Sequence, residues 1–274
     1  MAKLYIPTHA EWRSYCKTIT LNTGIDMGYI ELGDTDKETV VFVHGYADSS
    51  LMYHAITSRM QDDYHIYCVD MRGHGISSKP EQYAYTIMQI RDDVVDFLSQ
   101  MGIDNCYMVG ESMGSMVTQA VAFTSPERVK KIALISTFAS LSDTPEGLDR
   151  TLREYTEWTK NDIDLEQFVP NYRAYKEQEF FPVALEIMNN WPLHCWLAGW
   201  RGMELSDNRN FLQYIKAPTI IFWGAEDEVV SPAMKQETSK LMPNAKVVVY
   251  ENHTHNLSQE VPDEIAEELK VFFK

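Results

Sequence analysis

A serine in the pentapeptide Gly-Glu-Ser-Met-Gly, residues 110–114, is the chain's first candidate for covalent chemistry. An apolar strand-like run, Cys106–Val109, precedes the pentapeptide, and a helix-like run, Ser115–Phe123, follows it. The two glycines omit side chains where strand, turn and helix must approach closely. The backbone can therefore turn sharply and hold the Ser112 oxygen above a helix N-terminus, ready to attack a carbonyl carbon. An ordinary helix cap is the alternative interpretation, since serine caps helices often.

A serine nucleophile needs a base, and the base needs an acid that fixes its tautomer and offsets its charge. The candidate acid is Asp227, three residues after Gly224 and just beyond the strand-like run Thr219–Trp223. Side chains that follow parallel strands converge at one edge of the sheet, which is where a site is expected. Glu226 and Glu228 flank Asp227, and either of them could be the acid instead. A solvated acidic loop is the non-functional interpretation.

Two histidines compete for the role of base after the strand-like run Val247–Tyr250. They are His253 and His255, and the second is followed by Glu260 and Pro262 at plus five and plus seven. With Ser112 and Asp227 either histidine would complete the chain order serine, acid, histidine.

Two further stretches each follow a strand-like run. Residues 44–49, His-Gly-Tyr-Ala-Asp-Ser, come after Val40–Val43, and residues 70–77, Asp-Met-Arg-Gly-His-Gly-Ile-Ser, come after Ile66–Val69. With these motifs in this order, the chain resembles the α/β-hydrolase superfamily over nearly its whole length. Within that superfamily it resembles the members that have a serine nucleophile and a helical cap.

The resemblance implies specific catalytic residues. In capped members a Gly-His is typically followed by Glu at plus five and Pro at plus seven; His255 matches that spacing, whereas His253 does not. Thr254 stands where glycine is usual. The implied triad is Ser112, Asp227 and His255, with His253 in a supporting or surface position.

The stretch at residues 44–49 resembles the family's oxyanion loop. The resemblance implies that the backbone N–H groups of Tyr46 and Met113 bind the oxygen that becomes charged in the tetrahedral intermediate. The stretch at residues 70–77 resembles a loop with a structural role, so Arg72 and His74 are not expected to be catalytic. His44 is likewise expected to be loop scaffolding.

Alternating strand-like and helix-like runs predict an α/β fold with a doubly wound, mostly parallel twisted sheet. The strands are nearly continuous apolar runs, as expected for parallel strands buried on both faces. The resemblance implies the α/β-hydrolase fold, with helices on both faces and an inserted helical cap. The expected hairpin strands are Thr18–Leu21 and Met27–Glu31, the expected parallel strands Val40–Val43, Ile66–Val69, Tyr107–Val109, Ile132–Ile135, Thr219–Trp223 and Val247–Tyr250, and the expected helices Ile87–Gln100, Ser115–Phe123, Pro232–Leu241 and Pro262–Phe273.

The alternation breaks in the middle of the chain, which predicts a core domain of residues 1–137 and 207–274 and a cap, or lid, of residues 138–206. The predicted cap holds four of the six tryptophans, Trp158, Trp191, Trp196 and Trp200. Singly, each of these rings is expected to pack the cap onto the core. Together they indicate an apolar cavity where the two parts meet.

Composition excludes some classes of partner. Of the 274 residues 45% are hydrophobic and 23% charged, and the formal charge is −16, which opposes nucleic acid or an anionic membrane and favours solubility. No apolar run reaches the ~20 residues of a membrane span, and the first residues lack the apolar core of a secretory signal. The four cysteines are far apart, so we expect free thiols, buried at Cys68 and Cys106, and a cytoplasmic protein.

The motifs predict a cofactor-independent serine hydrolase acting on a small or medium apolar carboxylic ester or lactone. A serine nucleophile disfavours dehalogenase and epoxide hydrolase chemistry, which uses a carboxylate at this position. Neither a metal nor a cofactor is expected: the His-x-His pair lacks a matched third ligand, and no nucleotide-binding glycine motif occurs.

Several alternatives share the same triad: a C–C bond hydrolase, a thioesterase, an acyltransferase or a perhydrolase. A ligand-sensing, receptor-like member with little turnover is an alternative of another class. The substrate's identity and the oligomeric state are left open. Glu111, beside the nucleophile, is expected to be a supporting or solvated carboxylate, with tuning of the pH profile as its possible further effect.

Overall fold

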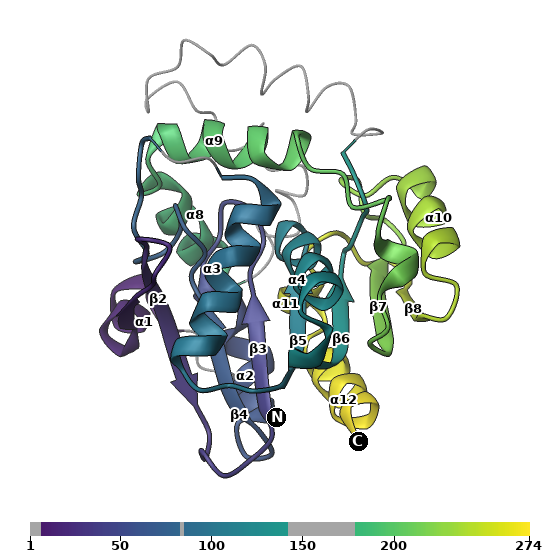
Figure 1. The fold of residues 1–274 in the computed structure, drawn as a ribbon, viewed down its shortest axis with the longest axis horizontal. Coiled ribbons are helices and arrows are strands. Elements are labelled where there is room, and N and C mark those ends of the chain that lie inside the picture. The colour runs from purple at the N-terminus through teal and green to yellow at the C-terminus, as the bar shows by residue number, and fades with distance from the viewer. Residues whose placement is uncertain (1–6, 83–84, 142–178) are drawn as a thin grey trace.

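The computed structural model describes residues 7–82, 85–141 and 179–274. They contain an eight-stranded sheet in the order β1-β2-β4-β3-β5-β6-β7-β8 (Figure 1). The strands are β1 (Lys17–Thr20), β2 (Asp26–Leu32), β3 (Thr39–Val43), β4 (His65–Val69), β5 (Cys106–Glu111), β6 (Val129–Ile135), β7 (Thr219–Gly224) and β8 (Lys246–Tyr250). The predicted doubly wound sheet is confirmed.

Strands β3 to β8 are parallel to one another, and β1 and β2 form an antiparallel hairpin at one edge. Hairpin strand β2 also pairs antiparallel with β4. Parallel strands all finish at the same end of the sheet, its carboxyl end. The polar residues that follow β3, β5 and β7 therefore lie together at that end.

Helices cover both faces of the sheet. Figure 1 shows α3 and α4 packed together in front of the strands and α2 behind them, where α2 contacts α12. The described helices are α1 (His9–Tyr15), α2 (His54–Met60), α3 (Ile87–Gln100), α4 (Met113–Thr124), α8 (Phe181–Asn189), α9 (Leu193–Glu204), α10 (Pro232–Leu241), α11 (Leu257–Glu260) and α12 (Pro262–Phe273), with short 3-10 helices η1 (Ser50–Tyr53), η2 (Pro126–Arg128) and η5 (Leu212–Tyr214).

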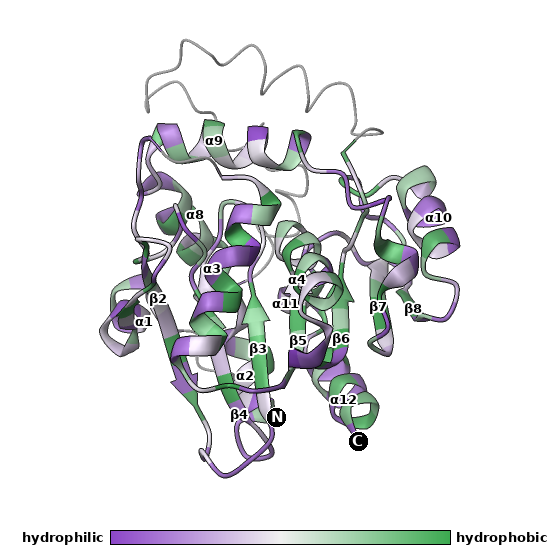
Figure 2. Ribbon diagram, in the orientation of Figure 1, coloured by the Kyte–Doolittle hydropathy of each residue, from purple (hydrophilic) through white to green (hydrophobic). Residues whose placement is uncertain are grey.

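The distribution of hydrophobic residues along each strand and helix explains how deeply that element is buried. Figure 2 shows β3 and β5 mostly hydrophobic, whereas α3 alternates hydrophilic and hydrophobic turns. Helix α4 is buried at every residue from Met113 to Ala122, since it lies between the sheet and its neighbouring helices. Within the described residues, no helix is long and apolar enough to cross a membrane.

The expectation that every parallel strand is buried on both faces is wrong for β8. Val247 and Val249 are 42% and 49% exposed. Alternate side chains of a strand point to the same face of the sheet, so these two valines share one exposed face of β8, which the apolar composition of the strand does not reveal.

Three described helices were not predicted. Helix α1 begins with a capping box in which Thr8 and Glu11 satisfy each other's backbone N–H groups, a signal that is visible in the sequence. Helices α2 and α11 are short, and α2 is buried at five of its seven residues, so neither shows an amphipathic period.

The predicted cap, residues 138–206, is partly described. Residues 142–178 of it, with Trp158, lie outside the described residues. The described part contains α8 and α9, and Figure 1 shows α9 lying across the end of the sheet toward which β3 points. The division into core and cap remains a prediction.

Candidate active site

Ser112 alone forms the turn between β5 and α4. Its backbone angles are φ 51° and ψ −118°, a left-handed conformation that non-glycine residues seldom adopt. It stands at the helix N-cap, yet its side chain makes no capping hydrogen bond. The structure therefore contradicts the ordinary helix-cap interpretation and leaves a strained, partly exposed serine.

The two glycines of the pentapeptide are required by close packing. A Cβ on Gly114 would lie 2.1 Å from the carbonyl oxygen of Val43 and 2.3 Å from that of His44. A Cβ on Gly110 would lie 2.4 Å from the carbonyl oxygen of Gly114. Both positions thus bring helix, turn and strand closer than any side chain allows, as predicted from the sequence.

Asp227 and His255 are brought together by the loops after β7 and β8. His255 Nδ1 lies 2.9 Å from Asp227 Oδ2. The other carboxylate oxygen accepts hydrogen bonds from the backbone N–H groups of Val229 and Val230 at 2.8 and 2.9 Å. With both oxygens bound, the carboxylate is fixed, and His255 Nε2 is left to act as an acceptor.

The pair is electrostatically matched. Burial raises the pKa of Asp227, but the charge and hydrogen bond of His255 and the two backbone donors outweigh burial, so the net pKa is lowered. Burial lowers the pKa of His255, but the charge and hydrogen bond of Asp227 give a net rise above 6.5. Asp227 therefore favours the imidazolium that forms when a histidine accepts a proton.

The end of β6 links the nucleophile's turn to the histidine loop. The Ser112 N–H donates to the carbonyl of Ile135 at 2.9 Å. The next residue, Ser136, donates its hydroxyl hydrogen to the carbonyl of His255 at 2.6 Å. No hydrogen bond among the described residues joins Ser112 to His255, a contact that often tightens only when substrate binds.

The competing residues lie elsewhere. Glu226 and Glu228 are exposed, while Asp227 is buried. His253 is directed to Glu260, with its Nδ1 3.0 Å from Oε2. Among the described residues, only Asp227 bonds to His255 through a side-chain carboxylate.

Glu260 explains how Thr254 replaces the usual glycine. Its Oε2 accepts the Thr254 N–H at 2.9 Å, and its Oε1 accepts the Thr254 hydroxyl. The carboxylate therefore holds the backbone just before His255, and the threonine side chain adds a bond that glycine lacks.

The predicted oxyanion loop lies against Ser112. A Cβ on Gly45 would be 3.5 Å from Ser112 Cβ and 3.6 Å from the carbonyl oxygen of Glu111. Tyr46 follows directly, and Met113 is the first residue of α4, whose N–H has no partner within a helix. Met113 thus follows Ser112 directly in the chain, and Tyr46 directly follows a residue that lies against Ser112 in space.

The residues predicted to be scaffolding are buried and bonded. His44 Nε2 accepts the Met71 N–H at 3.0 Å, and Arg72 bonds the Asp93 carboxylate at 2.6 and 2.7 Å. Burial lowers the pKa of His74 well below 6.5, so this ring is neutral. The role predicted for His44, Arg72 and His74 agrees with these contacts.

Glu111 is not solvated, contrary to one expectation. It is 1% exposed, and its Oε2 accepts the hydroxyl hydrogen of Ser258. Burial raises its pKa to about 8. Its Oε1 makes no hydrogen bond with any described residue.

Sequence reasoning missed Ser136 and Ser258, which hold the histidine loop. Ser258 stands three residues after His255, but serines in loops are too common for that spacing to identify a role. Ser136 has φ 47°, which no sequence pattern indicates. Both contacts join segments more than 100 residues apart, by separations of 119 and 147.

Three tryptophans of the predicted cap gather around Tyr46. The ring centroids of Trp191, Trp196 and Trp200 lie 5.1, 5.8 and 6.0 Å from that of Tyr46. These contacts agree with the packing interpretation of the tryptophans. The apolar cavity remains a prediction.

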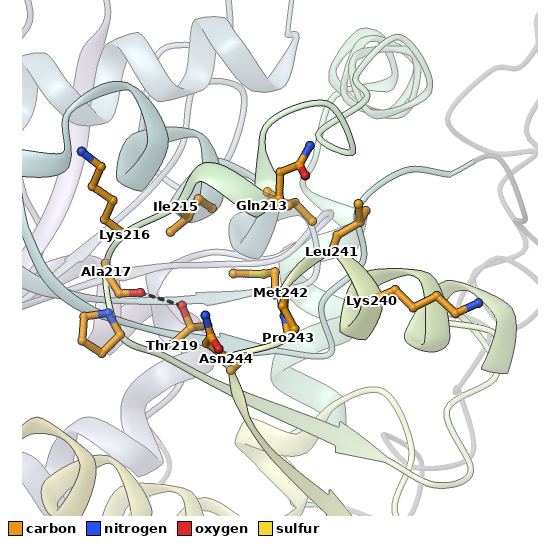
Figure 3. A pocket seen from close by; sticks show the side chains of 13 residues that line it. Gln213, Ile215, Lys216, Ala217, Thr219, Lys240, Leu241, Met242, Pro243 and Asn244 are labelled. Carbon is orange, nitrogen blue, oxygen red and sulfur yellow. Dashed lines mark hydrogen bonds between the residues drawn. The ribbon is translucent and has the colours of Figure 1, made fainter.

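A groove of about 480 Å³ lies away from these residues. Figure 3 shows it between η5, the start of β7 and the end of α10, with Ile215, Lys216 and Met242 among its lining. It lies at the amino end of β7, whereas Asp227 follows the carboxyl end. None of the predicted catalytic or oxyanion residues lines it.

The described residues contain no group of three or more His, Cys, Asp or Glu side chains that could hold a metal ion. The four cysteines are free, and Cys68, Cys106 and Cys195 are buried.

Comparison with known proteins gives the family. Lipase 1 of Psychrobacter immobilis is 27% identical over 266 residues, covering 93% of this chain and 83% of the lipase. 3-Oxoadipate enol-lactonase 2 of Acinetobacter baylyi is 25% identical over 248 residues, covering 86% and 89%. The solved structure of Est816, described as an N-acyl homoserine lactone degrading enzyme, matches with a TM-score of 0.81 at 25% identity, covering 93% of this chain and 100% of Est816.

A family model described as alpha/beta hydrolase fold matches residues 38–180, more than half of the chain. The match agrees with the parallel sheet, with the turn at Ser112 and with the order of the loops that follow the strands. The chain belongs to the α/β-hydrolase family.

Proposed function

We propose that this protein is a cofactor-independent serine hydrolase that cleaves a small or medium apolar carboxylic ester or lactone. Ser112 is the nucleophile, His255 the general base and Asp227 the acid that orients it. The backbone N–H groups of Tyr46 and Met113 form the oxyanion hole.

The observation that carries this proposal is the buried hydrogen bond between Asp227 and His255. This hydrogen bond joins His255 Nδ1 to Asp227 Oδ2 at 2.9 Å, so His255 Nε2 is the nitrogen available to take the serine proton. Ile135 accepts the Ser112 N–H, and the next residue, Ser136, bonds the backbone carbonyl of His255. The turn at Ser112 and the loop of His255 are therefore both tied to the end of β6.

The first half of the reaction acylates the serine. Ser112 Oγ attacks the carbonyl carbon while His255 Nε2 takes its proton, and the carbonyl electrons move to the oxygen. The N–H groups of Tyr46 and Met113 bind that oxyanion, and in the best-studied enzyme of this kind one such donor contributes about 3–4 kcal/mol. When the tetrahedral intermediate collapses, His255 returns the proton to the leaving alcohol.

The second half releases the acid. His255 removes a proton from water, whose oxygen attacks the acyl carbon, and the regenerated Ser112 leaves with the proton from His255. A lactone follows the same path, with the leaving alcohol still tethered to the acid.

Support for an apolar substrate comes from the residues around the oxyanion loop and from the relatives. Trp191, Trp196 and Trp200 are buried around Tyr46, so the loop proposed to supply an oxyanion donor is packed in an aromatic, apolar cluster. The relatives include proteins named as lipases and as an enol-lactonase.

The test compares wild type with Ser112→Ala and Ser99→Ala. Each protein is treated with a fluorophosphonate probe and assayed with p-nitrophenyl esters of increasing chain length and with γ- and δ-lactones. We expect labelling and turnover in wild type and in Ser99→Ala, whose hydroxyl bonds only to its own helix among the described residues, and neither in Ser112→Ala. Retention of labelling by Ser112→Ala would exclude the mechanism.

A further inference from the structure

The Tyr46 side chain extends away from the sheet into α9. Its ring meets three tryptophan rings at steep interplanar angles of 75°, 87° and 64° for Trp191, Trp196 and Trp200. These are the edge-to-face arrangements that aromatic quadrupoles favour. The ring is therefore held from several directions by residues of the predicted cap.

Two features fix the ring against α9 itself. The Tyr46 hydroxyl donates to the backbone carbonyl of Trp196 at 2.6 Å. A Cβ on Gly199, one turn further along α9, would lie 3.0 Å from Tyr46 Cε2 and 3.4 Å from Cδ2. Glycine at 199 thus lets the ring pack directly on the helix backbone.

The backbone around this side chain is strained. Ala47, the next residue, has φ 62°, a left-handed conformation that an alanine seldom adopts. Such a conformation persists only where surrounding contacts impose it. The anchoring of Tyr46 in α9 is a contact that can impose it.

The residues just before α9 also contact the loop after β4. Trp191 donates its Nε1 hydrogen to the carbonyl of Gly73, and its ring centroid lies 4.5 Å from that of His74. Because the ring of His74 is neutral, this cluster holds together through packing and hydrogen bonds. Helix α9 and the residues just before it are therefore connected to two loops at the carboxyl end of the sheet.

From these contacts we propose that the side chain of Tyr46 is a positioning group, which couples the place of α9 to the place of the Tyr46 N–H in the oxyanion hole. This inference rests on the proposed function. A displacement of α9 moves the ring, the ring moves its own backbone, and the donor leaves the position that the oxyanion requires. Binding of the ground-state ester depends on this donor much less than binding of the tetrahedral intermediate does.

Two substitutions disturb the coupling in different ways. Tyr46→Phe keeps the ring and removes the hydrogen bond to Trp196. Gly199→Ala keeps every group of Tyr46 and pushes its ring by a few tenths of an ångström. Tyr85→Phe is the matched control, because the Tyr85 hydroxyl also contacts α9, at 3.7 Å from Cys195 Sγ, but belongs to neither the oxyanion loop nor the triad loops.

The readouts separate the transition state from the ground state. We would measure kcat and KM for p-nitrophenyl butyrate and the inhibition constants of an aliphatic trifluoromethyl ketone and its methyl ketone isostere. Ser112 Oγ adds to the carbonyl carbon of the trifluoromethyl ketone, and the serine proton moves to His255. The former carbonyl oxygen of the inhibitor then carries the negative charge, as the oxyanion does. The second binds as the unreacted ketone.

For Tyr46→Phe and Gly199→Ala we expect kcat to fall about tenfold with KM within about twofold, since complete loss of one oxyanion donor costs about 10²–10³ in kcat. The preference for the trifluoromethyl ketone over the methyl ketone should fall by a similar factor. Tyr85→Phe should keep the wild-type preference.

An unchanged inhibitor preference in both folded variants, with any loss confined to KM, would overturn the positioning role and assign Tyr46 to substrate packing alone. Thermal unfolding of each variant checks that it is folded. If Gly199→Ala does not fold, Tyr46→Phe decides the question alone. If fluorophosphonate does not label wild type at Ser112, the proposed function itself is wrong. That result is distinct from failure of the coupling, in which wild type is labelled but the variants keep the inhibitor preference.

Discussion

The Glu111 carboxyl group accepts a hydrogen bond from Ser258 and thereby joins the strand that carries Ser112 to the short helix that follows His255. Both residues are buried, and Glu111 directly precedes Ser112, the proposed nucleophile. Burial, with the nearby charge of Asp48, raises the pKa of Glu111 to about 8 against the opposing effects of Ser258 and His255, so at neutral pH this acid is held mainly in its protonated form.

The first prediction concerns pH and stability. The folded protein keeps a proton on Glu111 that the unfolded chain releases above its ordinary pKa of 4.5. Stability from that proton is complete below pH 4.5 and is lost as pH rises toward 8, at up to ~1.4 kcal/mol per pH unit. Glutamine has no such proton to lose, so the free energy of unfolding of Glu111→Gln should rise relative to wild type from pH 5.5 to 7.5.

Urea unfolding followed by tryptophan fluorescence at several pH values measures this difference. Glu226→Gln, which removes an exposed carboxylate, is the control and should give a difference that does not change with pH. Parallel curves for wild type and Glu111→Gln would mean that Glu111 is ionised in the folded protein.

The second prediction separates the three acids of the loop after β7. Asp227→Asn should lower kcat by about 10⁴-fold, because the amide no longer supports the imidazolium or the required tautomer. Glu226→Gln and Glu228→Gln should stay within about twofold of wild type, since both side chains are exposed and away from His255. A large loss in either glutamine variant, with activity kept in Asp227→Asn, would reassign the acid.

The third prediction concerns the acid limb of the pH–rate profile. His255 must be neutral to accept a proton, and its pKa is raised above 6.5 chiefly by the charge and hydrogen bond of Asp227 acting against burial. We therefore expect kcat/KM to fall on the acid side with an apparent pKa above 6.5. In Asp227→Asn the residual activity should show this limb at lower pH, while in His253→Asn the limb should not move.

The fourth prediction concerns the turn at the nucleophile. Gly114→Ala should lower the free energy of unfolding by about 3 kcal/mol, because its Cβ meets two backbone carbonyls that cannot rotate away. Gly45→Ala is the matched variant, since its Cβ would lie at the ordinary contact distances of 3.5 and 3.6 Å. Equal stability of the two variants would show that the turn relaxes more easily than this packing allows.

Much of the fold could be predicted because buried parallel strands are short apolar runs and the longer helices are amphipathic. The helices α3, α10 and α12 begin and end at the predicted residues. Prediction failed where burial depends on a distant neighbour. Val249 is exposed on one face of the strand that ends the described sheet, and α2 is buried where it packs against α12.

The candidate site shows the same division. Ser112, Asp227 and His255 stand in local motifs that follow parallel strands, so these motifs and the family resemblance they carry were enough to propose the three residues. The bonds of Ser258 to Glu111 and of Ser136 to His255 depend on side chains meeting across the fold. The position of Tyr46 within α9 likewise depends on packing that no local pattern encodes.

The exposed strand β8 has a consequence for the durability of the enzyme. His255 follows this edge strand, whereas Ser112 follows β5, which has a strand on either side. Local opening of a sheet edge requires less free energy than global unfolding. On warming, the histidine should therefore separate from an intact nucleophile turn, and catalytic inactivation should precede the melting of the core.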